Sequence, residues 1–244
     1  MRSASAASLA VRQFVDGAAC EIYNAPVKRA PQPVEAVLFD LDGTLIATNL
    51  DFAAMKQALL RLTAEFLPLP SGLEQLDMLS IIQKASEQIA NAWERTAYQQ
   101  AAEELLVSFE LPAAHLAEEI PPARKVVSAL VEKGVRVGLV TRNCRSAALV
   151  ALGRVPLPHQ VLLTRNDVVH PKPHPEQLLE AARLLKAQPQ LSIMVGDHPM
   201  DVQGGKSAGM FTVGVVHHPH TRERFDGCPP DVFVSSLDEL LCLI

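Results

Sequence analysis

The chain has 244 residues, a net charge of −5 and 48% hydrophobic residues, so it is long enough for one large domain or a core with an inserted domain. It carries no basic stripe, which excludes the electrostatic signature of a nucleic-acid-binding protein, and no apolar run approaches the ~20 residues that span a bilayer. Its four cysteines (Cys20, Cys144, Cys228 and Cys242) show no Cys-x-x-Cys spacing, which argues against a zinc site or a disulfide framework and favours a reducing compartment.

The first 33 residues form an extension and linker ahead of the first domain. Residues 1–12 are rich in Ser and Ala, carry two Arg and contain no acid, a composition compatible with an organellar transit peptide and equally with a flexible bacterial N-terminus. Residues 25–33 hold three prolines and two basic residues, as is typical of a linker. We predict a cytoplasmic protein, with organellar targeting as the alternative.

The mostly apolar run at the start of Val34–Leu45 ends in two carboxylates separated by one residue, Asp40 and Asp42, which a glycine and a threonine follow. Its Val, Leu and Phe content suits a strand buried on both faces of a parallel sheet. Because residues i and i+2 of a strand point the same way, Asp40 and Asp42 start out together at the carboxyl end of this strand. Gly43 allows a sharp turn and a close backbone approach to a bound group, and Thr44 offers a hydroxyl and an amide to an anion.

The next segment, residues 48–119, has helical periodicity. Residues 51–66 place apolar side chains at helical spacing, and a break at 68–72 separates them from a second periodic stretch at 74–111. No strand signal interrupts this segment. We therefore expect an inserted, all-helical domain of three or four helices over residues 48–119.

From residue 121 onwards, predicted strands alternate with predicted helices. The expected strands cover residues 135–140, 161–163, 191–195, 211–216 and 231–234. The expected helices cover the segment from Pro121 to Gly134 and residues 145–152, 175–186, 202–208 and 237–243. This alternation predicts a doubly wound α/β fold with a parallel sheet, built from residues 34–47 and 120–244, which binds ligands at the carboxyl ends of its strands.

Three further signals fall at those carboxyl ends. Thr141 ends the strand 135–140, and Lys172 stands in a His-Pro-Lys-Pro-His-Pro segment whose prolines restrict the backbone. The string Gly-Asp-x-x-x-Asp, which supplies Asp197 and Asp201, follows the strand 191–195. Together with Asp-x-Asp-Gly-Thr, these signals resemble in order and spacing the four motifs of the haloacid dehalogenase-like (HAD) phosphohydrolases. The helical insert resembles the C1 cap of subfamily I, in which the phosphoglycolate phosphatase-like members fall.

The resemblance implies an Mg²⁺-dependent phosphatase with an aspartyl-phosphate intermediate. Asp40 would be the nucleophile and a metal ligand, together with the backbone carbonyl of Asp42 and the side chain of Asp197. Asp42 would also act as general acid and then as general base. Asp201 would lie behind the ligands or pair with the motif lysine.

The same resemblance assigns residues to the phosphoryl group. Thr141 and Lys172 would hold the phosphoryl oxygens and offset charge in the transition state. Gly43, Thr44 and Arg142 would add contacts to the phosphate through amide or hydroxyl groups.

Three positions depart from the usual family pattern. Arg142 directly follows Thr141, where many relatives carry Asn, and Asn143 comes one place later, so the substrate contacts there stay open. His198 stands where Ser or Thr is frequent, and we expect it to be a loop residue rather than a ligand. Residues 46–48 lack the Asp-Ser common in phosphoglycolate phosphatase-like members, which leaves the substrate open.

The expected substrate is a small, phosphoglycolate-like phosphorylated metabolite, with sugar phosphates as the alternative. We expect a monomer or homodimer with no nucleic-acid or membrane partner. A β-phosphoglucomutase-type phosphomutase shares every motif, whereas Asp42 and Asp197 argue against a dehalogenase. A non-catalytic binding module would be expected to lose Asp40, Asp42 or Lys172. The histidine tract 217–220 is interpreted as a polar loop rather than a metal site.

Overall fold

The computed structural model of the protein describes residues 11–15, 18–22, 29–217 and 219–244. The chain divides into two compact units, Met1–Ala47 with Ala117–Ile244, and Thr48–Leu116. Among the described helices, none is long and apolar enough to cross a membrane. Residues 1–10 and 25–28 lie outside the described residues. The structure therefore does not test whether the N-terminus is a targeting segment, and it describes the predicted linker 25–33 only from residue 29 onwards.

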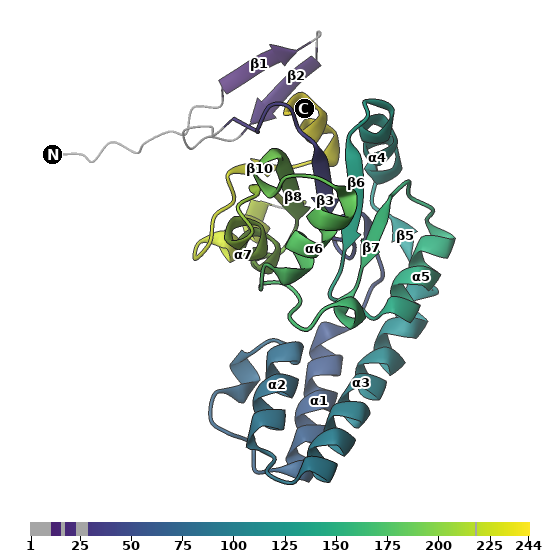
Figure 1. The fold of residues 1–244 in the computed structure, drawn as a ribbon, viewed down its shortest axis with the longest axis vertical. Coiled ribbons are helices and arrows are strands. Elements are labelled where there is room, and N and C mark those ends of the chain that lie inside the picture. Colours follow the sequence, from purple (N-terminus) through teal and green to yellow (C-terminus); the bar gives the residue numbers. More distant parts are fainter. Residues whose placement is uncertain (1–10, 16–17, 23–28, 218) are drawn as a thin grey trace, which may run out of the picture. The chain divides into compact units, whose positions relative to one another are not determined.

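A six-stranded parallel sheet forms the centre of the first unit (Figure 1). Its strands are β3 (Ala36–Phe39), β6 (Arg136–Val140), β7 (Val161–Leu163), β8 (Ser192–Gly196), β9 (Phe211–Val215) and β10 (Val232–Val234). They lie in the order β10-β9-β8-β3-β6-β7, and every neighbouring pair is parallel. The chain runs from β3 outward to β7 and then returns to β8 on the other side of β3. This confirms the doubly wound α/β fold and places its topological switch point at β3.

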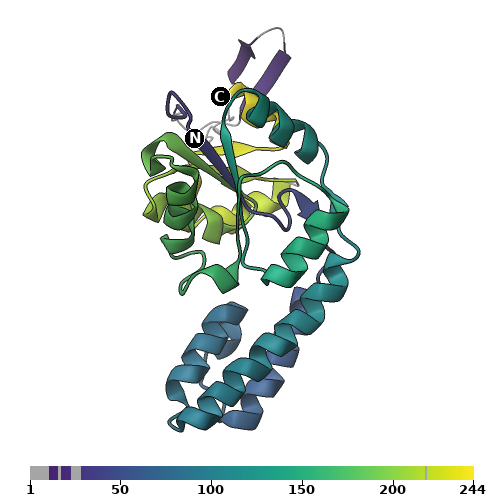
Figure 2. The ribbon, with the colours of Figure 1, turned by 45° about the vertical axis from the view of Figure 1, so that its right-hand side comes forward.

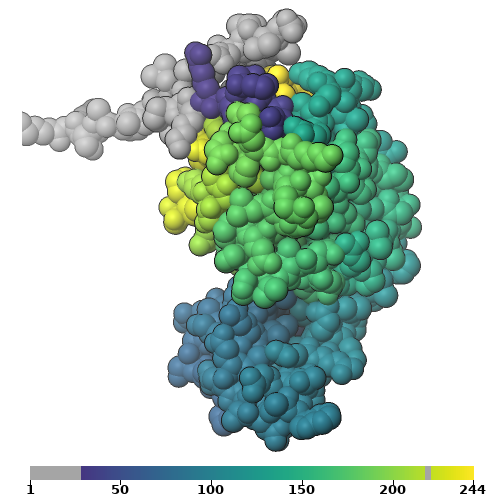
Figure 3. All heavy atoms as spheres, viewed as in Figure 1, coloured from purple at the N-terminus to yellow at the C-terminus, as the bar shows by residue number. Residues whose placement is uncertain are grey.

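Apolar helix faces cover the sheet. The helices of this unit are α4 (Ala123–Glu132), α5 (Arg145–Arg154), α6 (Glu176–Leu185) and α7 (Pro199–Ser207). Leu178 and Leu185 of α6 are buried against Leu38 of β3 and Met194 of β8. The green atoms of α6 accordingly cover the middle of the face shown in Figure 3. Each Å² of apolar surface that these contacts remove from water stabilises the folded protein by about 25 cal/mol.

Helix α7 begins at Pro199, three residues before the expected start at residue 202. His198 is its N-cap, because His198 Nδ1 accepts a hydrogen bond from the Met200 N–H at 3.2 Å. The Asp201 carboxylate closes the capping box by accepting from the His198 N–H at 3.1 Å. His198 is therefore a capping residue, and Asp201 lies in the first turn of the helix rather than in the loop before it.

A short antiparallel ladder joins the two ends of the inserted segment. In it, β4 (Ile46–Ala47) pairs with β5 (Glu118–Glu119). The expectation of helix through residue 119 was wrong for these two glutamates. Their extended conformation is set by pairing with a distant strand, and the local sequence carries no alternating apolar pattern that would reveal it. A hairpin of β1 (Val11–Val15) and β2 (Ala18–Ile22) was not predicted either.

The second unit contains three packed helices, α1 (Phe52–Phe66), α2 (Met78–Gln88) and α3 (Ala92–Ala114), drawn in blue to teal in Figure 2. Asp51, Asp77 and Asn91 cap their N-termini with side-chain oxygens. Tyr98 is fully buried among the helices, and its hydroxyl lies 3.0 Å from Thr63 Oγ1. The helical character predicted for this insert is confirmed over Thr48–Leu116.

Candidate active site

A buried lysine joins two carboxylates at the carboxyl end of the sheet. Asp40 directly follows β3, and its main-chain N–H donates to the Val195 carbonyl of β8 at 2.9 Å. Lys172 Nζ donates to Asp40 Oδ1 and to Asp201 Oδ1, each at 2.6 Å. It also donates to the Val140 carbonyl at 2.7 Å. Lys172 is only 1% exposed, so these three acceptors satisfy all three protons of an ammonium group that water does not reach.

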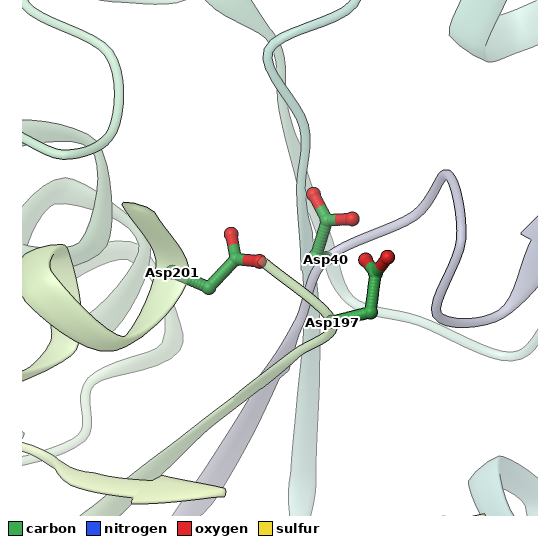
Figure 4. A group of neighbouring side chains, drawn as sticks. All are labelled: Asp40, Asp197 and Asp201. Carbon is green, nitrogen blue, oxygen red and sulfur yellow. The ribbon is translucent and has the colours of Figure 1, made fainter. Parts of the chain in front are cut away.

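Three carboxyl groups, two of them bonded to this lysine, gather at the carboxyl end of the sheet (Figure 4). Asp40 and Asp197 lie side by side at the ends of β3 and β8, and Asp201 reaches toward them from α7. One oxygen from each lies within 4.8 Å of the other two. Oxygen ligands of this kind suit Mg²⁺. Three ionised carboxylates against one ammonium also leave an excess of negative charge, which a divalent cation would balance. The residues present therefore fit such an ion.

Burial changes the proton affinity of this cluster. Desolvation raises the pKa of Asp40 well above 3.8; the Lys172 ammonium lowers it, and the carboxylates of Asp201 and Asp197 raise it again. Desolvation also raises the pKa of Asp197, and the Asp201 carboxylate adds to this. Burial opposes the charge of Lys172, but Asp201 and Asp40 outweigh burial and raise the pKa of this ammonium. The lysine thus stays charged, while the carboxyl groups of Asp40 and Asp197 hold protons more tightly than usual.

The turn after β3 brings its backbone against Asp197. Gly43 has a φ of +86°, and a Cβ atom at this position would lie 2.6 Å from Asp197 Oδ2. Thr44 Oγ1 donates to Asp197 Oδ1 at 3.2 Å. The Gly43 N–H, which was expected to face a phosphate, instead donates to the Ile46 carbonyl at 2.8 Å. In this structure the Gly43 N–H and the Thr44 hydroxyl are used within the protein, where they shape the turn and orient Asp197.

The second carboxylate of the first motif contacts a different group of residues. Thr141 follows β6, and its Oγ1 donates to Asp42 Oδ2 at 3.5 Å. Asn143 Nδ2 donates to the same oxygen at 3.3 Å. The main-chain N–H of Asn143 donates to Thr141 Oγ1 at 3.0 Å. The structure therefore brings Asp42 and Thr141 together, and adds Asn143, to which the sequence assigned no role.

Arg142 lies beside the start of α7. Its guanidinium group contacts Met200 Sδ, and its main-chain carbonyl accepts from Arg165 Nη1 at 3.2 Å. Burial lowers the pKa of His198, and the positive charge of Arg142 contributes to this lowering. A neutral imidazole is what the N-cap of α7 requires, because its Nδ1 must accept a hydrogen bond there.

Two further contacts were not predicted. Gln177 is fully buried on α6, where its Nε2 donates to the Thr141 carbonyl at 2.9 Å and its Oε1 accepts from the Lys172 N–H at 3.3 Å. Gln177 thereby fixes the backbone of Thr141 and Lys172. In the sequence, the feature that could have revealed this role is a polar residue on the apolar face of a predicted helix. His217 Nε2 donates to the Gly43 carbonyl at 2.9 Å. His217, the first residue of the histidine tract, thus contacts the turn after β3, and His218 lies outside the described residues.

Comparisons with known proteins agree with this arrangement. Residues 37–215 match the family described as Haloacid dehalogenase-like hydrolase. The pyrophosphatase PpaX of Bacillus cereus (strain G9842) is 31% identical over 217 residues, which cover 86% of this chain and 96% of that protein. A phosphonoacetaldehyde hydrolase-like protein from Oleispira antarctica has a TM-score of 0.66 at 21% identity, over 91% of this chain and 95% of that one. A HAD phosphatase from Thermococcus onnurineus has a TM-score of 0.57 at 25% identity, over 86% of this chain and 97% of that one. The chain therefore belongs to the haloacid dehalogenase-like hydrolase family and is an enzyme of the phosphatase class.

Proposed function

We propose that the protein is a cytoplasmic, Mg²⁺-dependent phosphatase that hydrolyses a small phosphorylated metabolite through an aspartyl-phosphate on Asp40. The observation that best supports this is the cluster of Asp40, Asp197 and Asp201, in which Asp40 and Asp201 pair with the buried Lys172. It combines a carboxylate nucleophile, oxygen ligands for a cation and a fixed positive charge at the switch point of the sheet. The unit Thr48–Leu116 is proposed to be a helical cap domain, and Met1–Ala47 with Ala117–Ile244 the catalytic domain with its N-terminal extension.

The cation would be held by the side chains of Asp40 and Asp197 and by the main-chain carbonyl of Asp42. When bound, it would supply positive charge that reduces the repulsion between a carboxylate and a phosphate ester, about 4 kcal/mol for unit charges ~4 Å apart at an effective dielectric of ~20. Asp201 accepts from Lys172 and from the His198 N–H. Its proposed role is to hold the lysine in place behind the ligands.

Each chemical step can be assigned to a side chain. An oxygen of Asp40 attacks phosphorus, and the bond from phosphorus to the ester oxygen breaks. Asp42 gives its proton to the leaving oxygen, and then takes a proton from the water that attacks phosphorus; the bond from phosphorus to the Asp40 oxygen breaks and inorganic phosphate leaves. Lys172 offsets the charge of the phosphoryl oxygens with the ammonium that pairs with Asp40 in this structure, and the Thr141 hydroxyl is proposed to orient Asp42. At the end of the cycle Asp40 is again a carboxylate and Asp42 is again protonated.

The remaining predicted phosphate contacts have more limited roles. Because Gly43 and Thr44 bond to Ile46 and Asp197 in this structure, we propose that they act mainly by shaping the turn. Arg142 remains the candidate for a second anionic group on the substrate, since it adds a positive charge beside the start of α7.

The substrate class is tested by a phosphate-release screen on the purified protein with Mg²⁺. The panel contains 2-phosphoglycolate, several sugar phosphates and inorganic pyrophosphate, the last because a relative is named a pyrophosphatase. We expect release from at least one of them, and loss of release when EDTA removes the cation. Isomerisation of β-glucose 1-phosphate in the presence of a sugar bisphosphate, without net release, would replace the proposal by a phosphomutase. If the protein shows neither phosphate release nor isomerisation, it is a binding module rather than an enzyme of this kind.

Mg²⁺ is expected to raise the melting temperature more at about pH 8 than at about pH 5.5. The raised pKa values of Asp40 and Asp197 mean that the folded protein retains protons in mild acid, and a cation must displace them. The folded protein holds these protons more tightly than the unfolded chain does. As pH rises from the pKa of the unfolded chain through the raised pKa of the folded protein, the stability of the cation-free protein therefore falls. A bound cation restores this stability. At ~100 times its Kd, a ligand adds about 2.7 kcal/mol. Scanning fluorimetry with Mg²⁺ or EDTA measures the shift. A shift that is larger in acid would contradict the assignment.

Gly43→Ala is expected to cut phosphate release by about 100-fold, since a displacement of ~1 Å in an active site has an effect of this size. The new Cβ would collide with Asp197 Oδ2. Gly134→Ala is the matched control: its φ is +80° and no atom lies within 4 Å of the added Cβ. Both variants lose about 1–2 kcal/mol from the left-handed backbone, so the unfolding free energy should fall in both and activity only in Gly43→Ala. Equal activity loss in the two variants would show that strain alone is responsible.

A further inference from the structure

Asn143 contacts both Asp42 and Thr141 at the start of the loop between β6 and α5. We infer that Asn143 is a positioning residue, which holds the carboxyl group of Asp42 in the orientation that proton transfer to the leaving oxygen requires. This inference rests on the proposed function, because it assumes that Asp42 is the general acid. The hydrogen bonds of the Asn143 side chain and main-chain N–H go to Asp42, to the Cys144 N–H and to Thr141, and none of these three goes to the nucleophile Asp40.

The hydrogen bonds of Asn143 determine which end of its amide faces Asp42. Its Oδ1 accepts from the Cys144 N–H at 2.8 Å, so Nδ2 is the end that points to Asp42 Oδ2. Its main-chain carbonyl accepts from the Arg165 N–H at 3.3 Å. The residue is only 8% exposed. The Cys144 N–H thus fixes the side chain and the Arg165 N–H the main chain of Asn143, and the side chain presents a donor, rather than an acceptor, to the carboxylate.

Asn143 also determines where the hydroxyl proton of Thr141 points. Because Thr141 Oγ1 accepts from the Asn143 N–H, its own proton is directed to another acceptor, and Asp42 Oδ2 lies 3.5 Å away. The two donors therefore converge on one oxygen of Asp42. One residue supplies the first donor directly and orients the second.

This convergence restricts the carboxyl group of Asp42. The terminal torsion of an aspartate is broad and roughly two-fold, so a carboxyl group without such contacts can exchange its oxygens. Two donors at Oδ2 remove that freedom, and a proton on Oδ2 would point against both of them. The carboxyl group is therefore held in one orientation, which gives proton transfer a single geometry. Without the Asn143 side chain, the carboxyl group of Asp42 is still present but spends less time in the orientation that proton transfer requires.

The consequence can be measured through the leaving group. Proton donation matters most when the leaving oxygen is strongly basic, and little when it is weakly basic. Phenyl phosphate and p-nitrophenyl phosphate have nearly the same shape and differ in this basicity. We expect Asn143→Ala to lower kcat/KM for phenyl phosphate by about 10-fold or more and for p-nitrophenyl phosphate by less than about 3-fold, with KM little changed. The ratio kcat/KM reports on the steps up to departure of the leaving group, so the shared hydrolysis of the aspartyl-phosphate does not enter.

Asn166→Ala is the matched control, because Asn166 also accepts from a backbone N–H at the start of α5, that of Arg145 at 2.9 Å, and is exposed. It should leave the ratio of the two rates unchanged, and a thermal melt of each variant checks that it is folded. If Asn143→Ala lowers both rates by the same factor, or lowers neither, Asn143 is only structural and the inference is wrong. If the wild-type protein releases phosphate from no ester, the proposed function fails and the inference falls with it.

Discussion

Asp40→Asn should lower the rate of phosphate release by about 10⁴-fold or more and leave the protein folded. An amide of the same shape cannot attack phosphorus and form the acyl phosphate. The variant still presents an oxygen to Lys172, and Lys172 still pairs with Asp201. Since burial disfavours the ionised form of Asp40, removing this charge should not lower the melting temperature of the cation-free protein. Initial rates and the melting temperature of wild type and variant, both measured in EDTA and in Mg²⁺, test the two halves of this prediction.

The covalent step has its own measurement. Acid quenching of the wild-type protein during turnover of a ³²P-labelled ester should trap label on the protein, and the Asp40→Asn variant should trap none. Asp226→Asn is the matched control, since Asp226 is an exposed residue of the same unit and should keep full activity and labelling. Label that persists in Asp40→Asn would move the nucleophile to another residue and remove the central assignment.

The sheet could be predicted because its strands are short apolar runs between helical segments. Residues 36–39, 136–140 and 192–196 are buried on both faces, so their composition alone indicates parallel strands. The topology then places whatever follows them at one edge of the sheet. This is why Asp40, Thr141 and Asp197, far apart in the sequence, were expected near one another.

The parts that were missed depend on contacts that a local pattern does not contain. Glu118–Glu119 are extended because they pair with Ile46–Ala47. Helix α7 begins early because His198 and Asp201 cap it, and histidine is not among the residues that usually signal a cap. The roles of Asn143 and Gln177 follow from hydrogen bonds to residues of other motifs. A sequence shows that such side chains are polar, whereas their partners are determined by the fold.

Lys172→Met is expected to lower the unfolding free energy of the cation-free protein by about 3–5 kcal/mol at neutral pH, the usual result of removing one partner from a buried ion pair. Methionine has a similar length, so little packing is lost. Asp40 and Asp201 each lose a hydrogen bond of 2.6 Å and then face one another without a positive charge between them. Activity should fall by about 100- to 1,000-fold, as when one preorganised donor is removed from an active site. Denaturant unfolding in EDTA and initial rates in Mg²⁺ measure the two effects.

The pH dependence of the variant distinguishes lost charge from lost packing. The Lys172 ammonium lowers the pKa of Asp40 in the wild-type protein, so its removal raises that pKa further. The variant should therefore regain stability as pH falls through the raised pKa, because protons then neutralise the cluster. Mg²⁺ at neutral pH should restore part of the same loss, since the cation balances the carboxylates that the lysine no longer faces. A packing defect would respond to neither.

Lys206→Met separates this effect from that of losing any lysine. Lys206 is an exposed residue at the end of α7, and its replacement should change stability by no more than about 0.5 kcal/mol. If Lys172→Met were as stable as this control in EDTA, the three carboxyl groups would have to be neutral in the folded protein without any help from the lysine. They would then hold too little negative charge to recruit a cation at neutral pH. The stability of this one variant thus tests the electrostatic premise on which both the metal site and the phosphatase chemistry depend.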